Sequence, residues 1–385
     1  MTTYLSLEPL DVLAPRGNRL FSDGHGACLM PPWPSMLAGA IRTRILADKG
    51  IPFHAVRDGK VQDADVLREL GTYDEPGSFR VSVVGLTLNG EAWLPAPADL
   101  VGVLNGDRIG LHSLEPVPVE RLGGMGSFGL PWVPVLRQAD RAKAVGGLWL
   151  SVADLERHLR EEPASKLAPQ PSSAFWTTDP RLGIALDAEV RTAREGMLYT
   201  TDTIALQDRV SLMVGVQGAD ALLPNDGLLR LGGDGHAVRI AGALKTSPPS
   251  VEAVSPSFRV VLATPGMFRE GWLPPGVTRS DAGYVLRSGG FGAKLLAAAI
   301  GRHDVVSGWD LAKGEPKPAR RVVLAGSVYW FEQFEGGESD RQAWAESVLR
   351  QGWWAPAGEM TVEDRRRQSE GFNNVWLGSW ARSAS

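Results

Sequence analysis

The first residues whose types and spacing suggest chemistry surround an expected helix start, in the run PPWPSMLAGAIRTRIL at 31–46. A helix start leaves amide N–H groups without intrahelical partners and carries partial positive charge, so a phosphate is well placed there. Ser35 can cap the first turn, and Arg42 and Arg44 add cations. Trp33 can stack on an unpaired base. A core position for Trp33 and a solvated helix face for the arginines are the open alternatives.

Glycine-rich segments at three further places let the main chain approach a polyanion, because glycine has no Cβ to clash. The loop before the helix, from residue 15 to 34, carries the candidates Arg16, Arg19 and His25. The turn LGGDGH at 231–236 leads into a strand and adds Gly232, Gly233, His236 and Arg239. The stretch RSGGFGAKL at 287–295 adds Arg287 and Lys294. The turn at 231–236 also fits a plain hairpin turn that needs positive φ.

Enzyme signatures are missing from the sequence. The six histidines are scattered, and there is no HExxH, GxSxG or P-loop motif, so we expect neither a metal site nor a cofactor. A metal-independent endoribonuclease, with His25 or His236 as general base on a ribose 2′-OH, is the enzymatic alternative. A carbohydrate-binding module is a third class of function, suggested by the 13 tryptophans against five tyrosines. We expect most of the tryptophans to lie in the core.

Composition narrows the class of protein. A net charge of −4 argues against binding nucleic acid through bulk charge, so a polyanion site must be local. The start of the chain has no signal-peptide pattern, no window is apolar enough to cross a membrane, and Cys28 is the single cysteine. We therefore expect a cytoplasmic protein without membrane contact.

The elements that must position these residues follow from periodicity. We expect a strand at the N-terminus, the helix described above, and a hairpin at 79–97 that turns at Asn89-Gly90. The region 115–180, with one helix at 151–162, reads as an insertion lying over the sheet rather than part of it. Strands resume at 196–218 and after the second glycine-rich turn.

A Pro/Ser linker at 245–257 marks the expected boundary between a domain at 1–245 and a domain at 255–385. Beyond it we expect a strand at 258–266, a hairpin-like stretch at 291–309, a strand at 320–332, a helix at 340–352 and a last strand. The order matches two successive split β-α-β units. The predicted fold is therefore α+β, with tandem ferredoxin-like (RRM-like) domains and an inserted loop and helix region.

Six stretches, in this order, resemble the third RAMP subunit of the Cmr complex of type III-B CRISPR systems, from about residue 4 to 380. They are PPWPSMLAGAIRTRIL, GMLYTTDTIAL, LGGDGH, LATPGMFREGWLP, SGWDLAKGEPKPARRVVLAGSVY and GFNNVWLGSW. The region 115–180 is poorly matched. In the family loop before the helix, an Arg-x-x-Arg-Pro-Phe-like phrase, this chain has leucine at position 20 in place of proline.

The resemblance implies tandem ferredoxin-like domains that hold the repeat-derived 5′ tag of the guide RNA (crRNA) and have no nuclease activity. It also implies contact with the large Cas subunit on one side and the backbone RAMP subunits on the other, and only indirect contact with target RNA. Arg42 and Arg44 are the helix positions carried over as facing the RNA. These partners and roles are expectations of the resemblance.

Overall fold

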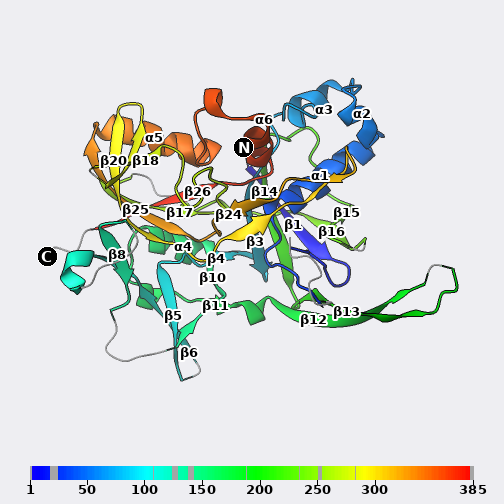
Figure 1. The fold of residues 1–385 in the computed structure, drawn as a ribbon, viewed down its shortest axis with the longest axis horizontal. Helices are drawn as coiled ribbons and strands as arrows, with labels where there is room; N and C mark the ends of the chain where they lie inside the picture. The colour runs from blue at the N-terminus through cyan, green and yellow to red at the C-terminus, as the bar shows by residue number, and fades with distance from the viewer. Residues whose placement is uncertain are drawn as a thin grey trace.

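The computed structural model describes residues 2–17, 25–106, 108–123, 129–137, 143–187, 189–233, 235–249, 254–281 and 283–381. Two antiparallel sheets form its centre, and a long two-stranded arm projects from one side (Figure 1). The expected α+β class with tandem ferredoxin-like units is confirmed. The linker predicted at 245–257 lies between the last strand of the first sheet and the first strand of the second.

The first sheet is built on a split β-α-β unit. Strand β1 (Thr2–Pro9) leads through helix α1 (Pro34–Asp48) to β3 (Arg80–Leu88), and β14 (Val210–Gln217) lies between the two strands. Strand β16 (Ala237–Ala243) pairs with the other edge of β1, which completes the order β16-β1-β14-β3. No helix joins β14 to β16; the described residues at 218–227 form turns instead.

The inserted region extends this sheet. Strands β3 and β4 (Glu91–Pro95) form the predicted hairpin, in which Asn89 and Gly90 both have positive φ. Strand β10 (Leu148–Ser151) pairs with β4, and β11 (Gln170–Pro171) pairs with β10. The expectation that 115–180 only lies over the sheet is therefore wrong. The run LWLS is buried on both faces and fills the open edge of β4.

The other elements of this half surround the two ends of the sheet. Helix α4 (Val152–Leu159) matches the predicted helix and is capped by Ser151, while α2 (Phe53–Arg57) and α3 (Ala64–Glu69) follow α1. The remaining strands of this half form small separate sheets or, for β15, an edge of the first sheet. They are β5 (Leu100–Asn105), β6 (Arg108–Ser113), β7 (Glu115–Pro118), β8 (Trp132–Val135), β9 (Ala144–Val145) and β15 (Leu228–Arg230).

The second sheet has the same ferredoxin-like order of strands, but its helix lies in the second crossover, whereas α1 lies in the first crossover of the first sheet. Strands β26-β17-β25-β20 form its centre, and helix α5 (Glu338–Gln351) lies between β25 and β26 in the chain. The strand bounds are β17 (Ser257–Leu262), β20 (Phe291–Ala299), β25 (Val328–Glu335) and β26 (Val375–Ser379). The hairpin of β18 (Val277–Ser280) and β19 (Gly283–Ser288) extends its β20 edge.

The strand predicted at 320–332 is two strands. Strand β24 (Arg320–Val322) pairs with β21 (Asp304–Val306) in a separate ribbon, and Gly326, at φ 85°, turns the chain before β25. A second small ribbon joins β22 (Trp309–Asp310) to β23 (Glu315–Pro316), and helix α6 (Val362–Ser369) follows α5.

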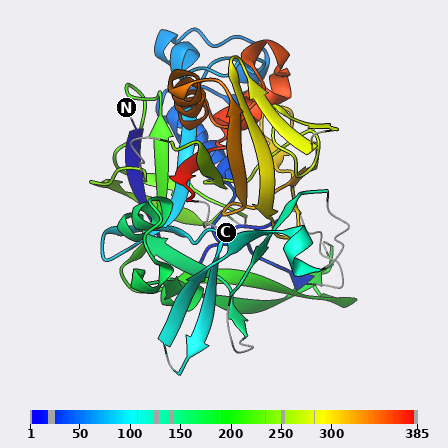
Figure 2. The same ribbon diagram turned by 90° about the vertical axis from the view of Figure 1, so that its left-hand side faces the viewer.

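Apolar residues bind the two sheets into one body. Helix α1 packs on one face of the first sheet and α5 on one face of the second. Residues from the opposite faces, such as Val83, Met213, Val261 and Trp330, share a core between the sheets. Figure 2 shows the two sheets from the side. Most tryptophans are buried, as expected, and Trp309 is the most exposed at 57%.

Candidate nucleic-acid interface

The first two glycine-rich segments meet beside Arg16. The Gly233 N–H donates to the Ala14 carbonyl over 3.0 Å. Gly232 has a φ of 84°, and a Cβ there would lie 2.8 Å from the same carbonyl oxygen. A Cβ on Gly233 would lie 3.4 Å from Arg16 Nε. Glycine is therefore needed at 232 because the two main chains approach closely, and the structure places Arg16, Gly232 and Gly233 in one patch.

The turn at 231–236 also serves as the hairpin turn that the sequence left open. The Leu231 N–H donates to the His236 carbonyl over 2.9 Å, which closes the turn between β15 and β16. Arg239 lies on β16 opposite Glu8 and forms an ion pair with it. Its charge is therefore shared with a carboxylate on the neighbouring strand, while His236 is held in the turn by main-chain hydrogen bonds to Leu231 and Gly233.

Residues 25–28, which precede α1, lie along the base of the arm. Strand β2 (His25–Gly26) pairs in parallel with Thr200 and Thr201, and Cys28 Sγ donates to the Asp202 carbonyl over 2.8 Å. Arg16 forms a bridge with Cys28 in the same region. Arg19, the remaining candidate of this loop, lies outside the described residues. The Arg16 patch is thus continuous with the arm.

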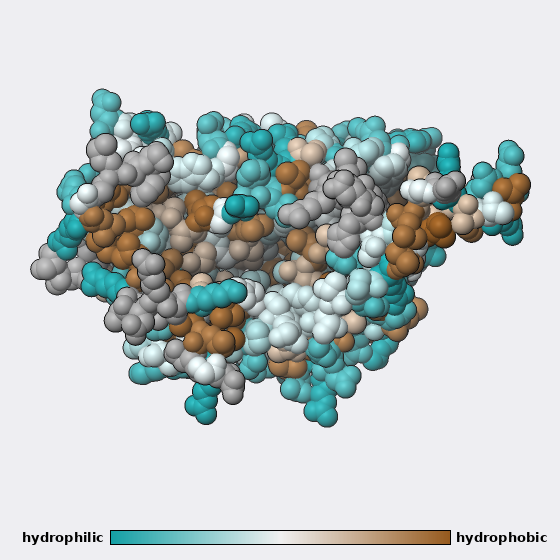
Figure 3. Space-filling model, turned by 60° about the horizontal axis from the view of Figure 1, so that its bottom comes forward, coloured by the Kyte–Doolittle hydropathy of each residue, from teal (hydrophilic) through white to brown (hydrophobic). Residues whose placement is uncertain are grey.

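The arm consists of β12 (Trp176–Leu186) and β13 (Ala193–Leu206), paired along their length. Its base is buried at Thr203 and Ile204, whereas Leu182 is 70% exposed and Leu198 is 58% exposed. Figure 3 shows apolar surface along the projecting arm. An exposed apolar ribbon of this kind can insert between bases or dock on a neighbouring chain.

The sequence reasoning missed the arm because it read strands only from residue 196. The run WTTDPRLGIAL at 176–186 has no clean alternation, and a proline at 180 argues against a central strand. The signal that could have predicted this hairpin was a turn-rich stretch between two runs of similar length. The proline is tolerated because this ribbon has two strands and its outer edges are free of further pairing over most of their length.

The start of α1 differs from the expectation. Trp33 is the N-cap residue, and no described side chain caps the first turn, so the prediction that Ser35 caps it is wrong. Pro34 occupies the first helical position, where its fixed φ suits a helix, and this shifts the start by one residue. Trp33 is 7% exposed and packs against Val306 and Phe372, so it is a core residue rather than an open stacking platform.

A cavity of about 420 Å³ lies beside this helix start. Trp33, Trp149 and Trp176 line it together with five prolines, and Asp304 contributes a carboxylate. Trp176 is the first residue of β12, so the cavity adjoins the base of the arm. Its indoles and small size suit a flat apolar group such as a nucleobase better than a phosphate.

Arg44 does not present a free cation on α1. Its Nε donates to Asp48 over 2.7 Å, and its Nη1 donates to the Leu228 carbonyl over 2.9 Å. The guanidinium therefore joins α1 to β15. The expectation that it faces RNA overlooked Asp48 one helical turn later, which is the residue spacing that favours an intrahelical ion pair.

The C-terminal candidates lie away from the Arg16 patch. Arg287, on β19, forms an ion pair with Glu335, and its guanidinium lies over the Phe334 ring at 5.3 Å. Lys294 is exposed on β20. Both lie on the β19–β20 side of the second sheet, remote from the arm in Figures 1 and 2. The structure does not bring them together with Arg16.

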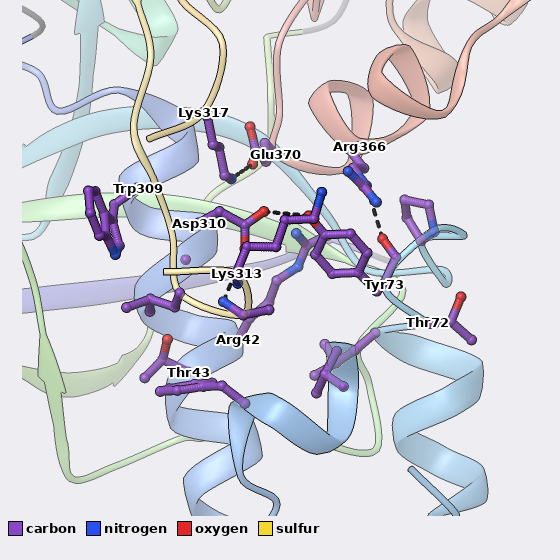
Figure 4. Close-up of a pocket in the computed structure, with 18 of the residues that line it drawn as sticks. Arg42, Thr43, Thr72, Tyr73, Trp309, Asp310, Lys313, Lys317, Arg366 and Glu370 are labelled. Carbon is purple, nitrogen blue, oxygen red and sulfur yellow. Dashed lines mark hydrogen bonds and ion pairs between the residues drawn. The ribbon is translucent and has the colours of Figure 1, made fainter. Parts of the chain in front are cut away.

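Arg42 points into a cavity between the two halves of the chain (Figure 4). This inter-domain cavity has a volume of about 360 Å³. Helices α1 to α3 and the loop 71–76 line one side, while the segment 309–318 and helix α6 line the other. Arg42 Nη2 donates to Ser369 Oγ over 2.8 Å, and its guanidinium lies 4.8 Å from the Phe79 ring centre.

Several polar contacts connect the walls of the inter-domain cavity. Tyr73 Oη donates to Asp310 over 2.7 Å, and Arg366 Nε donates to the Tyr73 carbonyl over 2.9 Å. The Arg366 guanidinium also lies 4.1 Å from the Tyr73 ring centre. Lys317 forms an ion pair with Glu370. These contacts fix the cavity's shape because each joins elements from different halves or different loops.

A buried charged group elsewhere escaped the sequence reasoning. His158 Nε2 lies 2.9 Å from Asp99 Oδ1, and Arg259 Nη1 donates to Asp99 Oδ2 over 2.6 Å. Burial opposes ionisation of Asp99, but His158 and Arg259 lower the pKa of its carboxyl to about 2. Burial, together with the Arg259 charge, lowers the pKa of the His158 imidazole. This group links the insertion to the second sheet.

Within the described ranges, no group of three or more histidine, cysteine, aspartate or glutamate side chains is arranged to hold a metal ion. Within the same ranges, no helix has the length and apolar character needed to cross a bilayer.

Comparisons with known proteins give a match over nearly the whole chain. The family model of a CRISPR-associated protein, Cas_Cmr3, matches residues 5–380. The chain is similar to one in the cryo-EM structure of the type III-B Cmr-beta bound to cognate target RNA and AMPPnP. The identity is 15%, the TM-score is 0.47, and the match covers 97% of this chain and 95% of that chain. No curated protein matches by sequence.

A second similar structure is the crystal structure of the Csm3–Csm4 subcomplex in the type III-A CRISPR-Cas interference complex. Here the identity is 10%, the TM-score is 0.37, and the match covers 85% of this chain and 92% of that chain.

Proposed function

Because the chain belongs to the Cas_Cmr3 family of CRISPR-associated proteins, we propose that it holds the repeat-derived 5′ tag of the guide RNA without cutting it. In this role it joins the large Cas subunit to the backbone RAMP subunits of a Cmr effector, in the cytoplasm, and meets target RNA only indirectly. The proposal takes the family as its premise and the geometry of the chain as its support.

The observation that carries the proposal is the convergence of Arg16 with Gly232 and Gly233 at the base of the arm. The close approach of Gly232 and Gly233 to the Ala14 carbonyl holds them beside Arg16, and Arg16 adds a cation of the type suited to phosphate. The indole-lined cavity next to β12 takes an unstacked base of the same strand. The exposed apolar arm then separates bases or docks on the adjacent subunit.

A non-catalytic role is supported by the surroundings of the histidines. General acid–base cleavage of RNA needs a titratable pair within reach of a ribose 2′-OH. The His–Asp contact that the described residues contain, His158 with Asp99, is buried at 1% and 0% exposure and bonded to Arg259. His236 lies in a turn whose described contacts are main-chain hydrogen bonds.

Retention of the guide by the assembled complex tests the binding role. We expect Arg16→Glu to lower the amount of guide RNA that co-purifies with the complex, while Arg108→Glu, an exposed change on β6, leaves it unchanged. Thermal unfolding of each variant chain separates loss of binding from loss of folding. Equal guide occupancy in a folded Arg16→Glu complex would remove this patch from the interface.

Incubation with labelled repeat RNA in EDTA tests the absence of cleavage. We expect intact RNA from the isolated chain and from a His236→Ala variant alike. Products that disappear in the variant would instead support the endoribonuclease alternative.

The negative net charge of the chain also determines how RNA binding is divided between this chain and its neighbouring subunits. With a net charge of −4, in which 44 acidic residues outnumber 40 lysines and arginines, the isolated chain offers RNA only a few local cations, so we expect weak RNA binding with a shallow salt dependence. Neighbouring subunits supply the remaining contacts in the complex. Tight binding of a tag-length RNA by the isolated chain in physiological salt would contradict this division.

A further inference from the structure

Arg42 is a part-buried cation that forms no ion pair with a carboxylate in the described part of the chain. Its contacts there are the Ser369 hydroxyl and the Phe79 ring, and its Nε is buried with no hydrogen-bond acceptor among the described residues. Burial lowers the pKa of its guanidinium, and the charge of the more distant Glu370 opposes this shift only in part. A charge left in this state is costly, so an anion that reaches it gains an unusually strong contact.

The other cations of the inter-domain cavity are matched by acids of the chain itself. Arg367, 1% exposed, lies 2.8 Å from Glu363 and 3.0 Å from Glu370. Arg366 lies 2.9 Å from Asp74. Arg42 is therefore the cation of the inter-domain cavity that has no ion pair with an acid among the described residues. Lys313, with its side chain 45% exposed, stands nearby and has its closest acid at 3.7 Å.

The mouth of the same cavity is apolar and aromatic. Trp309 is 57% exposed, Leu311 is 55% exposed, and Phe53 is 37% exposed, and all three line the cavity. The Tyr73 ring is covered by the Arg366 guanidinium and approached by Lys313, whereas Trp309 and Phe53 are open, and Trp309 is the larger and more exposed ring. A cationic floor below an open indole matches a ligand with an anionic end and a flat apolar end.

We propose that the inter-domain cavity binds a nucleotide, with its phosphate on Arg42 and Lys313 and its base against Trp309. The volume of about 360 Å³ is in the range of cavities that hold small ligands. Arginine suits the phosphate because its fork of N–H donors meets two oxygens at once. The site is separate from the Arg16 patch and does not depend on the proposed function.

Binding of AMP to the full chain, measured by calorimetry, tests the site. We expect AMP to bind at least ~10-fold more tightly than adenosine, because adenosine lacks the group that meets Arg42. Arg42→Gln loses at least ~10-fold in AMP affinity, whereas Arg108→Gln, an exposed change on β6, does not alter it. Adenosine binding as tightly as AMP, or unchanged AMP affinity in Arg42→Gln, would overturn the proposal.

Two further variants keep the test independent of any folding defect at Arg42. Lys313→Gln changes a half-exposed side chain, so it leaves folding intact and weakens AMP binding several-fold. Trp309→Ala removes the preference for AMP over inorganic phosphate but preserves phosphate binding. If both variants bind AMP as the parent chain does, the cavity does not hold a nucleotide.

Competition identifies the source of the phosphate. A tetranucleotide RNA that displaces AMP from the parent chain places a nucleotide of a strand in the cavity. Displacement of AMP by ATP but not by the RNA supports a free nucleotide, and both results support the site. Displacement by an acidic peptide as effectively as by AMP would overturn the nucleotide assignment in favour of a protein partner.

Discussion

Arg42 and Ser369 lie 327 positions apart in the chain, yet Arg42 Nη2 donates to Ser369 Oγ over 2.8 Å. The contact joins α1 of the first half to α6 of the second. It leaves Arg42 as a part-buried cation that is held in place by a hydroxyl rather than neutralised by an acid. Position 42 therefore faces the inter-domain cavity and not the start of its own helix.

Replacing Arg42 with methionine tests whether its charge is a cost to folding. Methionine keeps the packing of the stem on Phe79 and removes the uncompensated charge, so we expect a free energy of unfolding within ~1 kcal/mol of the parent or higher. Urea unfolding in chloride buffer measures it. Arg367→Met is the matched contrast.

Arg367→Met should lose about 3–5 kcal/mol, because it leaves Glu363 and Glu370 without their buried partner. A similar large loss in Arg42→Met would mean that Arg42 is a structural cation, and the account of the cavity would be wrong.

The stability of the fold should decline on acidification in two stages. His158 and Asp99 both have a pKa below their ordinary values, so the unfolded chain binds more protons than the folded chain. The contribution of His158 is complete above about pH 6.5 and is lost as pH falls below it, and that of Asp99 is lost below about pH 4. Each proton changes the unfolding free energy by up to ~1.4 kcal/mol per pH unit.

Urea midpoints at about pH 7 and pH 5 check the first stage. His158→Gln should flatten the dependence between these values, whereas the control His54→Gln, at an exposed position on α2, should not. An equal slope in parent and His158→Gln would show that another group takes up the proton.

Two glycines of one turn allow the cost of backbone strain to be measured separately from the cost of a clash between two main chains. Gly232 and Gly235 have φ of 84° and 76°, but a Cβ meets the Ala14 carbonyl only at Gly232. We expect Gly235→Ala to cost about 1 kcal/mol from strain and Gly232→Ala to cost ~1–2 kcal/mol more. The same pair of variants in guide retention should show a larger loss for Gly232→Ala. Equal effects would mean that the two main chains are not held together there.

The exposed part of the arm should matter for assembly and not for folding. Leu182→Ser and Leu198→Ser change side chains that are 70% and 58% exposed, so unfolding should shift by no more than ~0.5 kcal/mol. We expect the same changes to reduce the yield of guide-bearing complex. Leu104→Ser, at a position 58% exposed on β5, is the control. Normal assembly of the arm variants would show that its apolar surface has no partner.

Local patterns were sufficient to predict the elements with strong periodicity. The hairpin at Asn89-Gly90, the helix from about residue 35, the helix after Ser151 and the order of two split units are all present in the structure. These depend on spacing within a few residues, such as positive φ in a turn or apolar residues along one helix face. The order of strands then follows from the rule for split β-α-β units.

Long-range contacts were beyond the sequence. Nothing near Arg42 indicates that Ser369 would hold it, and nothing near Gly232 indicates that Ala14 would pack against it. Ion pairs such as Arg239 with Glu8 depend on strand register, which the pattern of one strand does not specify. Candidate residues could therefore be named from their type, but their grouping into the Arg16 patch and the inter-domain cavity required the fold.

Photo-cross-linking of the guide in the assembled complex tests the central claim most directly. With a thiouridine at one tag position at a time, we expect adducts on peptides that contain Arg16, the turn at 231–236 or the arm. A spacer-labelled guide should give far fewer adducts with this chain. Adducts confined to the β19–β20 side of the second sheet, or equal labelling from the spacer, would contradict the claim that the Arg16 patch holds the tag.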